Sequence, residues 1–167
     1  MEILILLGSE SDLETGHEAI KVFDEMGISY SLHIASAHRT PGKVRSLIKQ
    51  AEAGGARIVI AGAGMSAHLA GVVAAETLLP VIGIPMGGGP LNGLDALLST
   101  VNMPGGVPVA TVSIGKAGGK NAALLAARIL ALSDDNIRAK LEEHKKKMGD
   151  AVEESDKRVS GTGRKKT

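Results

Sequence analysis

The stretch ILILLGSESD, residues 3–12, contains an unbroken apolar run that ends at a glycine and is followed by small polar residues. An apolar run of this length is typical of a strand in a parallel sheet, which helices cover on both faces. A helical pattern then continues to about residue 25 and is closed by Gly27. The stretch therefore predicts a strand, a turn and a helix, which together are the first half of a βαβ unit.

The same order of strand, loop and helix recurs along the chain. Further strands are expected at 30–35, 57–64, 80–85 and 107–115, and helices from Pro41 to Gly54, at 66–78, at 94–101 and at 120–132. Alternation at this spacing favours right-handed crossovers and a parallel sheet between two helical layers. The expected fold is a three-layer αβα domain with a doubly wound, five-stranded sheet in the flavodoxin-like order 2-1-3-4-5.

The composition changes after residue 133. We expect an α/β catalytic domain at 1–133, a charged C-terminal helix at 134–159 and a disordered basic tail at 160–167. Acidic residues lie just upstream of the tail, so a solvated end is favoured over a nucleic-acid-binding arm. The helix at 120–132 is apolar on nearly every side, which predicts a subunit interface. The alternative is that the C-terminal helix folds back and covers it.

Composition narrows the class of protein further. The chain has no cysteine, a net charge of +1 and 44% hydrophobic residues, as expected of a globular protein without disulfides. Only 1% of its residues are aromatic, so no stacking surface for single-stranded nucleic acid is expected. The first residues have no basic region typical of a signal peptide, and no apolar run is long enough for a membrane span. A cytoplasmic location without membrane or nucleic-acid partners is expected.

Polar residues gather where the first strand ends. In the predicted strand order, ligands bind beyond the carboxyl ends of the strands, near the gap between the first and third strands. Ser11 and Glu14 have the spacing of a capping box, which predicts that Ser11 caps the first helix. The helix start then offers free backbone N–H groups to an anion. Ser9 and Asp12 are not explained by capping and are candidate ligand-binding residues.

The loop after the second strand reads SAHRTP. Thr40 is expected as the N-cap and Pro41 as the first residue of the next helix. Ser36, His38 and Arg39 remain without such an explanation. Arginine suits a phosphate, and a neighbouring permanent cation favours a neutral imidazole that can act as a base.

The loops after the third and fourth strands are rich in glycine. In GAGMSAHLAG, residues 62–71, Gly64 exposes backbone donors, Ser66 is the expected helix cap and His68 lies in the first turn. From the residues alone, His68 could equally contact a ligand or decorate the helix. GGGPLNG, residues 87–93, forms a lip free of large side chains and could act as a lid. No metal site is expected, because histidines and carboxylates do not occur at ligand spacing.

Four segments resemble the N5-carboxyaminoimidazole ribonucleotide mutase family, also described as the catalytic subunit of phosphoribosylaminoimidazole carboxylase. They are GSESD, SAHRTP, GAGMSAHLAG and the long segment 94–130, and the resemblance extends over residues 2–133. It implies an isomerase of de novo purine (IMP) biosynthesis. Such an enzyme converts N5-carboxyaminoimidazole ribonucleotide to 4-carboxy-5-aminoimidazole ribonucleotide by decarboxylation and recarboxylation. It also implies a homo-octamer that needs no cofactor.

The resemblance also implies roles for individual residues. His38 would be the catalytic acid and base. The residues implied to bind substrate are Ser9, Ser11, Asp12, Ser36, Arg39, Gly64, His68 and Leu69.

Two other functions stay open. The family has a second branch, which carboxylates aminoimidazole ribonucleotide directly with carbon dioxide. Arg39 and the turn Ala67-His68-Leu69 resemble the mutase branch, whereas residues 86–92 depart from its usual pattern, and Met65-Ser66 replaces a smaller Gly-Ala pair. The other alternative is a non-enzymatic, flavodoxin-like module that binds a mononucleotide, which the lack of aromatic residues disfavours.

Overall fold

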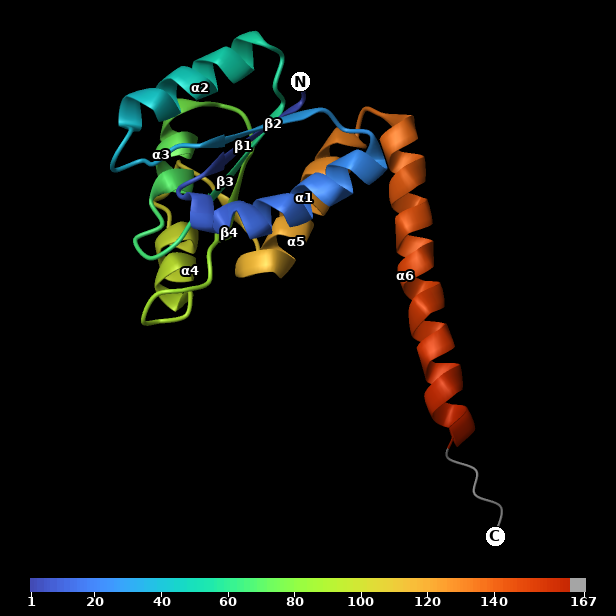
Figure 1. Ribbon diagram of the computed structural model, residues 1–167. Helices are drawn as coiled ribbons and strands as arrows, with labels where there is room; N and C mark the ends of the chain where they lie inside the picture. Colours follow the sequence, from blue (N-terminus) through green and yellow to red (C-terminus); the bar gives the residue numbers. More distant parts are fainter. Residues whose placement is uncertain (163–167) are drawn as a thin grey trace.

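The computed structural model describes residues 1–162, and its centre is a sheet of five parallel strands (Figure 1). The strands are β1 (Ile3–Leu7), β2 (Tyr30–Ile34), β3 (Ile58–Ala63), β4 (Val81–Pro85) and β5 (Ala110–Thr111). Their order is β2-β1-β3-β4-β5, and every neighbouring pair is parallel. The predicted topology is therefore confirmed.

The apolar run that opens the chain forms the middle of this sheet. All five residues of β1 are buried, and Ile5 pairs with Leu32 of β2 on one side and with Ile60 of β3 on the other. Because side chains alternate along a strand, Ile3, Ile5 and Leu7 join one core cluster and Leu4 and Leu6 the other. A strand with no polar face can be buried only between two helical layers.

Helices form those two layers. A one-turn 3-10 helix at Glu10–Asp12 leads into α1 (Leu13–Met26), which packs with α5 (Gly115–Leu130) on one face. The opposite face carries α2 (Pro41–Ala53), α3 (Leu69–Glu76) and α4 (Leu94–Val101). Figure 1 shows the strands between these groups, so the predicted three-layer αβα architecture is confirmed.

Three elements differ most from their expected bounds, and the other boundaries of the α/β domain shift by two residues at most. β5 has two residues instead of the nine expected at 107–115, because only Ala110 and Thr111 pair with β4. α3 starts at Leu69, because a turn occupies the residues before it. α5 starts at Gly115, five residues earlier than expected, and takes in a glycine-rich stretch that reads as a loop in the sequence.

The charged C-terminal segment forms α6 (Asp135–Thr162), which leaves the body of the molecule at an angle (Figure 1). Residues 160–162, which were expected in the tail, belong to this helix, and residues 163–167 lie outside the described part. The first turns of α6 contact α1 and α5, with Ile137 buried and Leu141 packed against the core. Within residues 1–162, no helix is both long and apolar enough to cross a bilayer.

The apolar helix at 120–132 is largely covered within one chain. Its alanines at 122, 123, 126 and 127 are fully buried against α1 and the sheet, while Leu132 remains exposed. Contacts with α1, the sheet and the start of α6 therefore bury most of the apolar residues of this helix. Most of this cover comes from α1, and only the first turns of α6 reach α5, so the C-terminal helix does not fold back over it as the alternative expected.

Candidate active site

A cavity of about 670 Å³ lies at the carboxyl ends of β1, β2, β3 and β4. This is the edge at which doubly wound sheets bind their ligands. The loops after the four strands line the cavity, and all nine residues predicted for the site contribute to it. These residues are Ser9, Ser11, Asp12, Ser36, His38, Arg39, Gly64, His68 and Leu69.

The loop after β1 contains a capping box that lies two residues before the expected one. The Ser9 backbone N–H donates to Asp12 Oδ2 at 3.1 Å, and the Ser11 backbone N–H donates to Ser9 Oγ at 3.4 Å. The capping box is thus formed by Ser9 and Asp12 on the 3-10 helix, not by Ser11 and Glu14 on α1. Glu14 instead forms an ion pair with Lys116 of α5 at 2.5 Å.

Asp12 is a half-buried carboxyl at the floor of this loop. Burial raises the pKa of the Asp12 carboxyl above its usual value, whereas hydrogen bonds from the Ser9 backbone and the Ser11 hydroxyl act in the opposite direction. A carboxyl group with a raised pKa in a cavity is a common feature of binding sites. Asp12 can accept hydrogen bonds from ligand hydroxyls.

The loop after β2 is held in shape by two hydroxyl side chains. Thr40 precedes α2 but does not cap it with its side chain. Its Oγ1 instead accepts from the Ser36 backbone N–H at 2.9 Å, and Ser36 Oγ accepts from the Arg39 backbone N–H at 3.2 Å. Thr40 thus occupies the predicted N-cap position, but the prediction that its side chain caps the helix is wrong. Ser36 accepts a hydrogen bond through its oxygen and can still donate its hydroxyl proton to a ligand.

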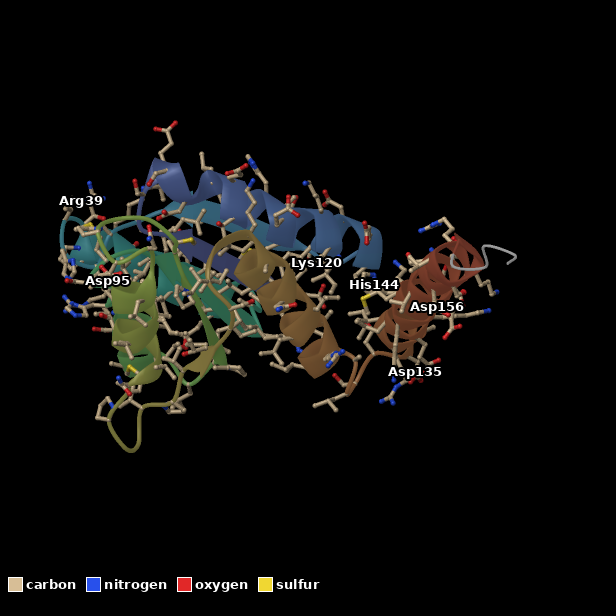
Figure 2. The ribbon with its side chains drawn as sticks, turned by 90° about the horizontal axis from the view of Figure 1, so that it is seen from below. Arg39, Asp95, Lys120, Asp135, His144 and Asp156 are labelled. Atoms are coloured by element: carbon tan, nitrogen blue, oxygen red, sulfur yellow. The ribbon has the colours of Figure 1, made fainter. Side chains whose placement is uncertain are left out.

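Arg39 ties the first two loops together. Its Nη2 donates to the Gly8 carbonyl at 2.9 Å, and the side chain is otherwise exposed. The remaining guanidinium N–H groups are available to an anion that sits over the start of the 3-10 helix. Figure 2 shows Arg39 at one end of the molecule, whereas His144 and Asp156 of α6 lie at the other.

Two histidines meet across the mouth of the cavity. His38 Nε2 lies 2.9 Å from His68 Nδ1, within hydrogen-bond distance, and the rings are nearly perpendicular at 87°. β2 and β3 flank β1 on opposite sides, so this contact bridges the end of β1. His68 thus contacts His38 within the candidate site, whereas its position in the sequence alone left open whether it lies in the site.

The far side of the cavity is apolar. Leu69 and Met86 are buried there, and Met65 and the glycines at 87–89 complete the wall. Met86 was not among the predicted site residues, although it directly follows β4 and the strand-end rule could have indicated it. Gly62 makes room for this side chain, because a Cβ at Gly62 would collide with Met86 Cε.

The cavity is open in the single chain. His38, Arg39, Met65, His68 and the 87–89 glycines are all exposed at its rim. In residues 1–162, no group of three or more His, Asp or Glu side chains is arranged to hold a metal ion.

The fold and this cavity define a doubly wound α/β protein with a small-molecule site at the topological switch point. Residues 2–151 match the family model described as AIR carboxylase, and the chain belongs to that family. The predicted resemblance is thereby confirmed at the level of the family.

Individual relatives cover nearly the whole chain. N5-carboxyaminoimidazole ribonucleotide mutase of Brucella melitensis is 48% identical over 154 residues, which are 92% of this chain and 95% of the relative. The protein of the same name from Pyrococcus horikoshii is 50% identical over 159 residues, 95% of this chain and 89% of the relative. The crystal structure of Treponema denticola PurE matches with a TM-score of 0.86 and 32% identity, covering 94% of this chain and 97% of that one.

Proposed function

We propose that this chain is a mutase of de novo purine biosynthesis that converts N5-carboxyaminoimidazole ribonucleotide to 4-carboxy-5-aminoimidazole ribonucleotide. The observation that carries the proposal is the contact between His38 and His68, which lies between a polar, anion-accepting side of the cavity and an apolar side. The names of the relatives agree with this reaction.

The polar side suits the ribose phosphate of the substrate. The hydroxyls of Ser9, Ser11 and Ser36 and the guanidinium of Arg39 offer hydrogen-bond donors to a phosphate. Asp12 accepts from ribose hydroxyls. The imidazole ring then extends toward the two histidines and the apolar wall.

The reaction needs one proton to be moved twice. Protonated His38 donates a proton to the carbamate nitrogen as the N–C bond breaks, which gives carbon dioxide and aminoimidazole ribonucleotide. The ring carbon then attacks carbon dioxide and forms the new C–C bond. His38 removes the hydrogen of that carbon, which restores both the aromatic ring and the protonated histidine. No net proton is consumed.

His68 would fix the orientation of His38. When His38 Nε2–H donates to His68 Nδ1, the Nδ1 atom of His38 is the position that gives and takes the mobile proton. The hydrogen bond also holds the imidazole ring over the cavity. His68 is thus a positioning residue for His38.

An assay with both candidate substrates tests the function. The purified protein is supplied either with N5-carboxyaminoimidazole ribonucleotide or with aminoimidazole ribonucleotide plus bicarbonate. We expect rapid formation of 4-carboxy-5-aminoimidazole ribonucleotide from the first. Faster turnover of the second would assign the chain to the carbon dioxide-dependent carboxylases, and tight nucleotide binding without turnover would support a binding module.

Removal of the Arg39 guanidinium should weaken substrate binding more than turnover. We expect Arg39→Ala to raise KM roughly 10- to 100-fold, because the hydrogen bonds it would lose are to a charged group. The control is Lys43→Ala, which removes an exposed cation from α2 outside the cavity. An unchanged KM in Arg39→Ala would separate this side chain from the phosphate.

We further propose a homo-oligomer located in the cytoplasm, with an octamer as the expected state. Leu94, Leu98 and Val101 form an apolar stripe on one face of α4, each about half exposed at 51%, 49% and 49%. α6 also extends beyond the body with Met148 and Val152 exposed, and most of the stability of a helix in a protein comes from the packing of its apolar face. A second copy of the chain would cover such surfaces.

Sedimentation at micromolar concentration checks this proposal. We expect the unmodified chain to sediment as an oligomer and Leu98→Asp to shift it toward smaller species, because a charge would be buried at the contact. Gln50→Asp, an exposed substitution on α2, is the control. A monomeric wild-type protein would contradict the proposal.

A further inference from the structure

Met65 has a backbone conformation that methionine rarely adopts. Its φ is +54°, in the left-handed region, where a side chain crowds the backbone. Glycine would adopt this conformation without strain, and asparagine tolerates it better than most residues. Backbone strain at the rim of a cavity suggests that the side chain itself has a role there.

The Met65 side chain reaches toward the opposite lip of the cavity. It is 60% exposed, and its Cγ lies 3.4 Å from the place that a Cβ would take at Gly89. Gly89 belongs to the loop after β4 and has a φ of +65°. Met65 therefore bridges the mouth between the loops that follow β3 and β4.

The backbone of Met65 also belongs to the turn that delivers His68. The Ala67 N–H donates to the Met65 carbonyl at 2.9 Å, and the His68 N–H donates to the Ser66 carbonyl at 2.7 Å. Since this turn brings His68 to His38, a useful substitution must keep the left-handed conformation while it changes the side chain. Glycine and asparagine meet that condition.

We propose that Met65 is a retention residue, whose side chain keeps released carbon dioxide in the cavity until the ring carbon attacks it. This inference rests on the proposed mutase function. Carbon dioxide is uncharged, and the side chains of Met65, Leu69 and Met86 hold it by dispersion contacts at the apolar wall of the cavity. If it escapes after the N–C bond has broken, aminoimidazole ribonucleotide is left and one proton is taken up from solvent.

A carbon-labelled substrate measures this retention. Wild type, Met65→Gly, Met65→Asn and Met65→Leu are given N5-carboxyaminoimidazole ribonucleotide labelled at the carboxyl carbon, in unlabelled bicarbonate. The ratio of released label to label in 4-carboxy-5-aminoimidazole ribonucleotide is then determined. We expect this ratio to rise roughly tenfold in the glycine and asparagine variants. Loss of one apolar group from a pocket usually changes discrimination by about 10-fold or more, and tenfold is the lower end of that range. The leucine variant, which keeps the apolar bulk, should stay near wild type.

Stability and rate provide the second readout. Met65→Gly should melt at or above the temperature of wild type, because the strain at this position is relieved. Total cleavage of the carbamate is measured alongside, and the share of cleaved substrate that loses its carbon dioxide should rise whatever the rate of cleavage. The combination of unreduced stability with increased loss of carbon dioxide is not expected of a residue that only supports the fold.

Three results would overturn the role of Met65. Label retention equal to wild type in Met65→Gly would show that the side chain does not hold carbon dioxide. Equal losses in Met65→Gly and Met65→Leu would show that apolar bulk is not the cause, and a parallel fall in cleavage and transfer would indicate an effect through His68. If wild type forms no carboxylated product from the carbamate, the proposed mutase function itself fails.

Discussion

The variant His38→Asn is expected to bind the nucleotide and to lose nearly all turnover. Asparagine is close to histidine in size and can still hydrogen-bond to His68, so the loop after β2 should keep its shape. It cannot exchange a proton near neutral pH. Because general acid–base groups contribute about 10²- to 10⁴-fold, we expect kcat to fall by a factor in that range.

Separate measurements of binding and rate distinguish a chemical role from a structural one. Calorimetric titration with 4-carboxy-5-aminoimidazole ribonucleotide should give a Kd close to that of wild type, and the melting temperature should not change. His17→Asn, at an exposed position on α1 outside the cavity, is the matched control. Near-normal activity in His38→Asn would refute the acid–base assignment.

The strands and most helices could be predicted because their signals are local. Apolar runs indicated β1, β3 and β4, the segment between the first two helical patterns indicated β2, and the spacing of the connections indicated the parallel order. The positions of His38 and Arg39 in the site followed from the rule that parallel strands bring their carboxyl ends to one edge. The resemblance to a known family added the roles of single residues, which spacing does not provide.

The features that could not be predicted depend on contacts between distant segments. The length of β5 is set by its pairing with β4, and the early start of α5 depends on how closely Gly118 and Gly119 approach their neighbours. Two overlapping capping boxes were compatible with GSESDLE, and local spacing does not distinguish them. The meeting of His38 and His68 depends on the conformations of the two loops that carry them, which the strand order alone does not determine.

A single methyl group at Gly119 is expected to destabilise the whole domain. Gly119 lies where α5 packs against α1, and a Cβ there would collide with the backbone carbonyl oxygen of Thr15. Where α1 packs against the sheet, a Cβ at Gly16 would likewise lie 2.8 Å from Leu7 Cδ1 of β1. A backbone atom within a helix cannot swing aside as a flexible side chain does, so α1 and α5 would have to separate.

We therefore expect Gly119→Ala to lower the free energy of unfolding by about 3 kcal/mol, at the upper end of the usual cost of overpacking. For a domain of this size that loss corresponds to roughly 6–12 °C in Tm. Gly42→Ala is the matched control, because Gly42 also lies in a helix and a Cβ there would meet no atom within 4 Å. Its Tm should be unchanged or slightly higher, since alanine favours the helix. Equal melting temperatures for Gly119→Ala and Gly42→Ala would mean that α1 and α5 are not in such close contact. The packing of α1, which positions the loop after β1, would then have to be revised.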